Sequence, residues 1–209
     1  VVDADLMLTA VAEHPAQAAS MPLGDPPRRL ARSRRFEQEQ HARFWWHRLP
    51  TSRYVPPVYG YLTDREWELL EEWYEETASM GAAGEINVPA MSVIQGLVMG
   101  NGLSRIVQLG HFHGYSALLL GFMLRAMGSR PGLFSVDISP EATAFSQSWV
   151  DRAKLGEFVH LHVGDSADEA TADAAASSLG GQPQLLLIDS SHQYEHTLRE
   201  LDTWSVRIP

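Results

Sequence analysis

Three aspartates follow short apolar runs in the second half of the chain. They are Asp137, Asp165 and Asp189, which come after the runs 133–136, 158–163 and 184–188. A carboxylate in such a place can accept hydrogen bonds from the hydroxyls of a ribose or from an exocyclic amine, and it can ligate a hard cation. One aspartate after a strand is often only the cap of the next helix, but that origin is less expected for all three. The pattern therefore predicts a ligand site shared by these carboxylates.

An earlier apolar run, 105–109, leads into a loop that begins at Gly110 and ends at Gly114. The loop lacks the Gly-x-Gly-x-x-Gly spacing that brings a pyrophosphate onto a helix N-terminus. Asp137 also lies further from it than the roughly 20 residues typical of a dinucleotide ribose carboxylate. These features disfavour a nicotinamide or flavin cofactor and favour a ligand with a ribose and an adenine but no phosphate. In that ligand Asp137 would accept the ribose hydroxyls and Asp165 an exocyclic amine, while the glycines would let the backbone approach a sulfonium-bearing amino acid.

The elements that must position these residues alternate between strand and helix from residue 103 onward. Short, continuously apolar runs separated by helical segments are typical of parallel strands buried on both faces. Right-handed crossovers then give a doubly wound α/β sheet, whose ligands bind beyond the carboxyl ends of the strands. The predicted strands are 105–109, 133–136, 158–163 and 184–188, and the predicted helices are 115–127, 140–154, one ending near 179, and 194–204.

The composition changes near residue 100, which divides the chain into a helical region, 1–100, and a Rossmann-like cofactor-binding core, 101–209. In the first region we predict helices over 29–48, 63–80 and 87–99. Thr63 and Glu66 form a capping box at the start of the second helix, and an asparagine caps the third.

An aromatic segment, 45–61, lies between the first two of these helices. It could form a lid or a wall of an acceptor pocket, or it could pack the helices onto the core.

The composition excludes several classes of protein. The 209 residues are 44% hydrophobic and 20% charged, which is the globular range, and the absence of cysteine rules out disulfides and thiolate chemistry. A net charge of −10 argues against nucleic acid as a partner. The apolar stretches are too short to span a membrane, and the acidic N-terminus is unlike a secretory signal, so we expect a soluble cytoplasmic protein without membrane partners. A cluster of arginines at 28–35 could bind an anionic substrate or a neighbouring subunit, or it could be a solvated helix face.

The segments 106–116, 136–137, 164–166 and 188–192 together resemble the class I S-adenosylmethionine-dependent methyltransferases. The likeness is closest to small-molecule O-methyltransferases of the catechol and macrolide-sugar (macrocin, cephalosporin-hydroxylase-like) type. Members of that group often read Gly-x-x-x-Gly-Tyr-Ser in the first loop, as 110–116 does here. After the fourth strand they read Asp-x-x-His-x-Tyr-Glu, as 189–195 does. The resemblance covers about residues 87–204.

The resemblance implies an enzyme that methylates a small hydroxylated molecule, such as a natural-product sugar or aromatic unit. We also expect the chain to form a homo-oligomer. It implies S-adenosylmethionine as cofactor, with Mg²⁺ as a further candidate. Asp189 would ligate the metal and take part in catalysis, and His192 would be the general base. The implied cofactor-binding residues are Gln108, Gly110, His111, Gly114, Tyr115, Ser116, Asp137, Asp165 and Ser166.

Gln108 departs from the family, which usually has an acidic residue at this position. The uncharged amide leaves two alternatives open: a methyltransferase fold with another activity, including N- or C-methylation, or a non-catalytic subunit of an assembly.

The sheet of this family normally has seven strands, whereas the sequence predicts four. The run 184–188 is suited to a central strand, and as an exposed edge it would invite aggregation. We therefore expect that the chain is incomplete at its C-terminus or that a partner supplies the missing strands.

Overall fold

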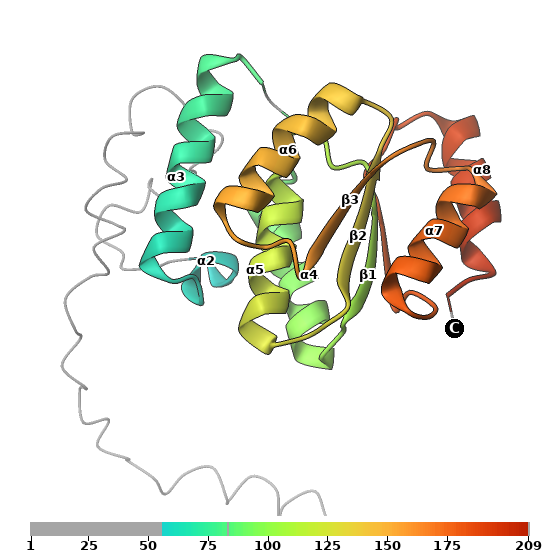
Figure 1. The fold of residues 1–209 in the computed structure, drawn as a ribbon, viewed down its shortest axis with the longest axis horizontal. Helices are drawn as coiled ribbons and strands as arrows, with labels where there is room; N and C mark the ends of the chain where they lie inside the picture. Colours follow the sequence, from blue (N-terminus) through green and yellow to red (C-terminus); the bar gives the residue numbers. More distant parts are fainter. Residues whose placement is uncertain (1–55, 83, 209) are drawn as a thin grey trace, which may run out of the picture.

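The computed structural model describes residues 56–82 and 84–208 of the chain. Four parallel strands form a sheet in the order β3-β2-β1-β4 (Figure 1). They are β1 (Arg105–Leu109), β2 (Gly132–Asp137), β3 (Val159–Val163) and β4 (Leu185–Ile188). Each begins and ends within a residue of its predicted bounds, and the predicted doubly wound α/β fold is confirmed.

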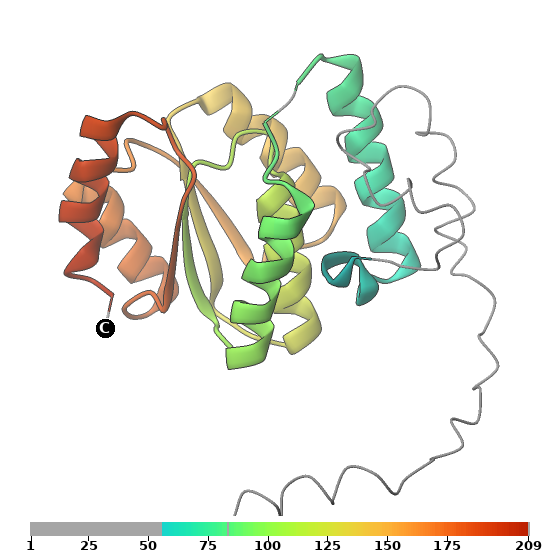
Figure 2. The same ribbon diagram turned by 180° about the vertical axis from the view of Figure 1, so that it is seen from behind.

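Helices cover both faces of this sheet (Figures 1 and 2). One face carries α4 (Val88–Asn101), α5 (Tyr115–Met127) and α6 (Pro140–Arg152), and the other carries α7 (Glu169–Leu179) and α8 (Tyr194–Ser205). The chain steps outward from β1 to β3 and then crosses to the opposite side of β1 to form β4. The strand order thus reverses between β1 and β4, which is where open α/β sheets bind ligands.

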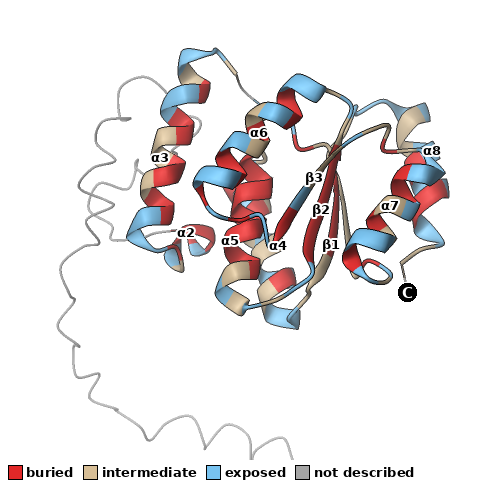
Figure 3. Cartoon of the chain, viewed as in Figure 1, coloured by how far each residue is buried: buried red, intermediate tan, exposed pale blue. Residues whose placement is uncertain are grey.

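The core follows from the alternation of side chains along the strands. Ile106 of β1 joins a cluster with α5 and α6, whereas Val107 and Leu109 point to the other face and join a cluster with α7 and α8. Figure 3 shows β1 and β2 as buried strands between these two layers. The edge strand β4 is only partly buried along its length.

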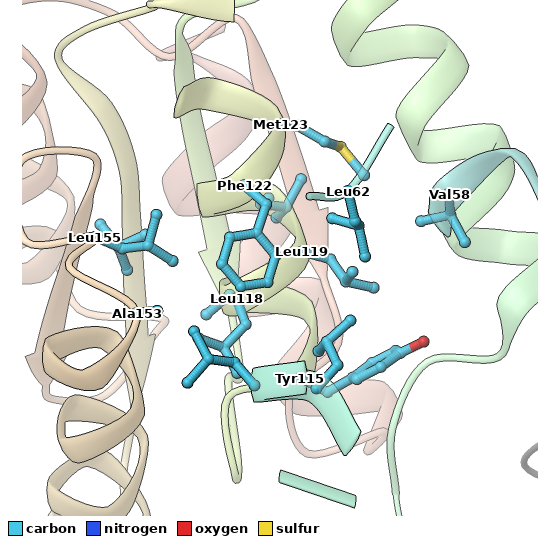
Figure 4. Close-up of a cluster of buried hydrophobic side chains, with 14 of the residues drawn as sticks. Val58, Leu62, Tyr115, Leu118, Leu119, Phe122, Met123, Ala153 and Leu155 are labelled. Carbon is cyan, nitrogen blue, oxygen red and sulfur yellow. The ribbon is translucent and has the colours of Figure 1, made fainter. Parts of the chain in front are cut away.

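Two further helices, α2 (Pro57–Gly60) and α3 (Asp64–Ser79), extend the core beyond the sheet (Figure 1). Leu62 lies beside Leu119 and Met123 of α5 in Figure 4, and Val58 of α2 belongs to the same hydrophobic cluster. The described residues before 100 therefore share one hydrophobic cluster with those after it.

The two predicted helix caps are confirmed. The capping box at Thr63 and Glu66 is complete, and the side chain of Asn87 accepts a hydrogen bond from the amide of Ala90. The predicted helix 29–48, the arginine cluster at 28–35 and the aromatic residues before 56 lie outside the described residues. Within the described ranges, no helix is both long and apolar enough to cross a membrane.

Candidate functional site

A cavity of about 590 Å³ lies at the carboxyl ends of the strands, within the usual size of a small-molecule site. Its walls are the loop after β1, the ends of β2, β3 and β4, and the segment that joins α3 to α4. The three strand-end aspartates, Asp137, Asp165 and Asp189, all line it. The structure therefore places on one cavity the carboxylates that lie far apart in the sequence.

Two glycines shape the loop after β1. Gly110 has a φ of 86°, and a Cβ added there would lie 2.2 Å from the backbone carbonyl oxygen of Asp189. Gly114 has a φ of 84°, and its added Cβ would lie 2.9 Å from Oγ of Ser146. Both positions combine a left-handed backbone with close packing, so only glycine fits them without strain.

The carboxylate of Asp137 holds this loop in place. Its Oδ2 accepts hydrogen bonds from the backbone amides of His111 (3.1 Å) and Phe112 (2.8 Å). Its Oδ1 accepts a 2.9 Å hydrogen bond from the amide of Ser139, the N-cap residue of α6. A carboxylate has about four acceptor positions, so Asp137 can cap the turn, fix the loop and still accept a bond from a ligand.

His111 lines the cavity, but its imidazole anchors the loop. Nδ1 lies 3.2 Å from Oγ of Ser135, and Nε2 lies 3.0 Å from Oγ1 of Thr143. Burial lowers the pKa of His111 to about 4, so the ring is neutral at neutral pH. With both nitrogens engaged, the side chain has no free atom for proton transfer, and the backbone of His111 is what it offers to a ligand.

Gln108 is fully buried beneath the loop. Its Nε2 donates hydrogen bonds to the carbonyl oxygen of Gly110 (2.7 Å) and to Oγ of Ser116 (2.5 Å). The amide thus ties the start of the loop to the first turn of α5. An acidic residue could not donate these bonds unless it were protonated, so the departure from the family pattern has a structural use here.

Tyr115 lines the cavity and also reaches into the core. The hydroxyl oxygens of Tyr115 and Tyr59 lie 2.6 Å apart. The hydroxyl oxygens of Tyr59 and Tyr74 lie 3.2 Å apart. Burial raises the pKa of both Tyr59 and Tyr74, so these hydroxyls stay protonated. Tyr59 and Tyr61, the described aromatic residues of the segment 45–61, therefore pack into the core and do not form a cavity wall.

The wall of the cavity on the side of α3 comes from residues that the sequence did not assign to the site. Trp73 and Thr77 of α3 contribute to it, as do Glu85 and Ile86 from the following connection. The indole Nε1 of Trp73 donates a 2.8 Å hydrogen bond to the carbonyl oxygen of His113. Only the helical spacing of Trp73 and Thr77 could have indicated this wall beforehand.

Asp189 and His192 lie together at the mouth of the cavity. Nε2 of His192 is 3.7 Å from Oδ1 of Asp189, and the histidine side chain is 78% exposed. Burial raises the pKa of Asp189, and the nearby His192 partly offsets this effect. The pair thus places an accessible imidazole beside a half-buried carboxylate.

His196, which no sequence motif indicated, lines the cavity from the first turn of α8. Its Nε2 lies 3.0 Å from Oγ of Ser166 and 3.3 Å from Oε1 of Glu200. These three residues are not arranged as a nucleophilic triad, because Glu200 accepts directly from Ser166 and does not bond Nδ1 of the histidine. The available signal was periodicity: His196, Glu200 and Trp204 lie four residues apart on one face of the predicted helix.

The cavity is acidic. Four carboxylates line it, and none of its described lining residues is lysine or arginine: the acids are Glu85, Asp137, Asp165 and Asp189. Phosphate groups are often bound by lysine or arginine side chains, and nearby carboxylates oppose their binding. This lining is better suited to a ligand that carries positive charge and no phosphate.

Residues 107–209 match the family model described as a methyltransferase domain. Among solved structures, an O-methyltransferase from Bacillus cereus in complex with SAH (S-adenosylhomocysteine) is 19% identical with a TM-score of 0.54, and the match covers 69% of this chain and 63% of that one. An SAH-bound methyltransferase from Podospora anserina is 20% identical with a TM-score of 0.55, over 82% and 66% of the two chains.

An O-methyltransferase from Streptomyces achromogenes involved in tomaymycin synthesis, in complex with SAM (S-adenosylmethionine), is 19% identical with a TM-score of 0.51, over 65% and 60%. The chain thus spans less than two thirds of the length of each of these proteins. Comparison with curated proteins gave no match. Residues 107–209 therefore match the methyltransferase domain family, and the described part of the chain shares the fold of these SAH- and SAM-bound methyltransferases.

Proposed function

We propose that this protein binds S-adenosylmethionine in the cavity and transfers its methyl group to an oxygen of a small hydroxylated molecule. The observation that carries the proposal is the acidic cavity at the reversal of strand order, without lysine or arginine among its described lining residues. The structures with bound SAH or SAM that share the fold support the same ligand.

The residues present suit this cofactor. S-adenosylmethionine carries a sulfonium and an ammonium group but no phosphate, so carboxylates on the wall favour it electrostatically. The backbone of Gly110 and the Ser116 hydroxyl line the part of the cavity next to α5, where the amino-acid end would lie. Asp137 keeps an acceptor position for the ribose, and Asp165 and Ser166 stand at the end of β3 for the adenine.

When bound, S-adenosylmethionine supplies an electrophilic methyl carbon on a positively charged sulfur. His192 would accept the proton of the acceptor hydroxyl as the oxygen attacks, and Asp189 would stabilise the resulting imidazolium from 3.7 Å. Because His192 is exposed, it can return the proton to solvent after each turnover. The α3 wall around Trp73 would exclude water and orient the acceptor. Such orientation supplies a large share of the rate enhancement in a methyl transfer.

Magnesium does not fit the described residues by themselves. No group of three or more histidine, aspartate or glutamate side chains in the ranges 56–82 and 84–208 could hold a metal ion. Asp189 supplies one carboxylate, and Mg²⁺ commonly binds through one or two carboxylates together with other oxygen ligands. The roles proposed for His192 and Asp189 therefore involve no metal ion, and magnesium is a variable in the binding experiment.

Titration calorimetry with S-adenosylmethionine and with SAH, each with Mg²⁺ or with EDTA, tests the proposal. We expect binding of both ligands under at least one condition, followed by methyl transfer in a screen of catechols and hydroxylated sugars. Absence of binding under every condition would overturn the proposal.

Variants then assign the roles. His192→Gln should lower turnover by about 100-fold while SAH affinity stays nearly constant, and Asp189→Asn should leave SAH affinity similarly intact. His160→Gln is the matched control, because His160 does not line the cavity. If Asp189→Asn remains active and EDTA has no effect, Asp189 has no metal role.

A non-catalytic subunit is the second candidate, and the uncharged Gln108 favours it. Binding of S-adenosylmethionine without turnover of any acceptor, in a chain that co-purifies with a partner, would support this reading.

A further inference from the structure

Gln108 belongs to β1 and lies beneath the loop that borders the cavity. Its side chain is fully buried and does not line the cavity. Its two hydrogen-bond partners, Gly110 and Ser116, do line it. Any effect of Gln108 on a ligand therefore passes through these two residues. The role inferred for Gln108 rests on the proposed function, in which the amino-acid end of the cofactor lies against them.

The carbonyl oxygen of Gly110 fixes the orientation of the Gln108 amide. A carbonyl can only accept, so the amide atom that lies 2.7 Å from it is Nε2 and not Oε1. The second hydrogen of the same amide group is then directed to Oγ of Ser116, at 2.5 Å. Oε1 is buried and has no partner among the described residues. Both hydrogen bonds of this side chain are therefore donations.

The bond from Gln108 leaves the proton of the Ser116 hydroxyl available to a ligand. The Ser116 oxygen accepts from Gln108, and within residues 56–82 and 84–208 no acceptor for the Ser116 proton is found. Ser116 is only 5% exposed and lines the cavity. A buried hydroxyl is costly to leave without an acceptor, so this side chain favours a ligand group that accepts a hydrogen bond.

The same amide holds the first peptide group of the loop. The carbonyl oxygen of this group belongs to Gly110 and accepts from Gln108. The N–H of the group belongs to His111 and donates to Asp137. The N–H of Gly110 is engaged as well, with the carbonyl oxygen of Val136 at 2.8 Å. The loop is therefore fixed where it leaves β1, and Gln108 supplies one of the bonds that fix it.

A carboxylate at position 108 would reverse these interactions. It has no proton to donate to the carbonyl oxygen of Gly110, so two oxygen atoms would face each other at the present 2.7 Å. It would also accept the proton of Ser116 and leave only the oxygen of that hydroxyl for a ligand. At the amino-acid end of the cofactor, the ammonium group can only donate and the carboxylate can only accept. The residue at position 108 thus decides which of the two groups Ser116 can bind.

We propose that Gln108 is a positioning residue that directs the Ser116 hydroxyl to the carboxylate of the cofactor. Replacing it with the acid that is usual in the family, Gln108→Glu, then weakens cofactor binding, because Ser116 no longer donates and the Gly110 carbonyl is repelled. If the acid were simply missing from this chain, the same change would strengthen binding through the ammonium group.

Calorimetry with SAH and with decarboxylated SAH tests this role, since the second ligand keeps the nucleoside, the sulfur and the ammonium group. For the wild-type protein we expect SAH to bind at least about 30-fold more tightly, because a charge-assisted hydrogen bond is lost with the carboxylate. In Gln108→Glu this ratio should fall to about 3-fold, with SAH itself binding about 30-fold more weakly. A purely structural role would weaken both ligands and leave the ratio unchanged.

Gln108→Met is the second variant. Its side chain is uncharged and nearly isosteric, so the protein should fold, and this variant carries the test if Gln108→Glu does not fold. Methionine neither donates to Ser116 nor takes its proton, so the ratio should be intermediate, about 10-fold. In Ser116→Ala the ratio should be about 3-fold, and adding Gln108→Met should change it by less than about 2-fold.

Gln95→Glu and Gln95→Met are the matched controls. Gln95 belongs to α4 and does not line the cavity, so both variants should keep the wild-type ratio. If the wild-type protein binds neither ligand, the proposed function fails and the role of Gln108 fails with it. If it binds SAH but the ratio is unchanged in Gln108→Met, or if Gln108→Glu binds SAH as tightly as the wild type, the proposed function stands and the role of Gln108 is overturned.

Discussion

The indole N–H of Trp73 and the backbone carbonyl of His113 are joined by a 2.8 Å hydrogen bond that connects α3 to the loop after β1. Both residues line the cavity. The helical part of the chain therefore contributes to the site in two ways: it forms a wall, and it holds the loop that would contact the cofactor.

Trp73→Phe should remove this bond while keeping an aromatic ring in the core. The lost hydrogen bond costs about 1 kcal/mol in the free energy of unfolding, and SAH affinity should fall because the loop is less well held. Trp67→Phe is the matched control, since Trp67 lies on the same helix and its Nε1 is buried without a partner among the described residues. Urea unfolding and calorimetry of both variants provide the measurement; equal effects in the two would show that the bond has no specific role.

The ion pair between Glu66 and Arg125 should contribute more to the free energy of unfolding than the exposed ion pairs of the same helix. Nη2 of Arg125 lies 2.6 Å from Oε1 of Glu66, whose side chain is only 8% exposed. Arg125→Met leaves this buried carboxylate without a cation, with only its capping-box hydrogen bonds from Thr63, so we expect a loss of about 3 kcal/mol in the free energy of unfolding. Arg65→Met, which breaks exposed pairs of the same helix, should cost less than about 1 kcal/mol. Losses of similar size would show that burial of the pair has no consequence.

Acidification should destabilise the protein through His111. Burial holds the pKa of this group at about 4 in the folded state, below its ordinary value of 6.5. The unfolded chain binds more protons between these two values, so stability is fully present above pH 6.5 and declines as the pH falls toward 4. The contribution of this one residue to the loss between pH 7 and pH 5 is about 2 kcal/mol.

Urea unfolding of the wild-type protein and of His111→Gln at both pH values measures this contribution. The variant is expected to be less stable at pH 7 but to lose about 2 kcal/mol less on acidification. His192→Gln, a change at an exposed imidazole, serves as the control. Parallel pH profiles for wild type and His111→Gln would contradict the assignment.

Gly110→Ala should be severely destabilising. The new methyl group would meet the Asp189 carbonyl at 2.2 Å, in addition to the strain of a φ of 86°. Gly128→Ala separates the two effects, because Gly128 has a φ of 63° and no atom within 4 Å of the added Cβ. We expect about 1–2 kcal/mol for Gly128→Ala and more than about 4 kcal/mol, or no soluble protein, for Gly110→Ala. A Gly110→Ala protein as stable as Gly128→Ala would mean that β1 and β4 can separate without cost.

The order of strands and helices could be predicted because the physical signals were local. The four apolar runs fixed the strands, and Thr63 and Asn87 marked helix starts by caps that depend only on residues three positions away. The meeting of Asp137, Asp165 and Asp189 on one cavity followed from the parallel arrangement, because all carboxyl ends then share one edge.

Side-chain direction in the loops was not predictable in the same way. His111 and His113 both belong to the loop after β1, so the sequence places each of them close to the cavity. Whether a loop imidazole points into the core depends on partners from other elements, which for His111 are Ser135 and Thr143. The motif likewise directed attention to His192 and away from His196. The latter acquires its contacts only once α8 packs against the end of β3.

The central position of β1 has a consequence for how the site is assembled. Ser104 and Gln184, which bond at the base of the β1–β4 pair, are 80 positions apart in the chain, whereas β1 and β2 are joined by a single helical connection. Closing the longer loop costs more chain entropy, so β4 is expected to dock last during folding and to detach first in partial unfolding. A nucleoside that contacts both the Gly110 loop and Asp189 would bridge the boundary between β1 and β4. Because it binds only the closed form, it would suppress the detachment of β4 by mass action.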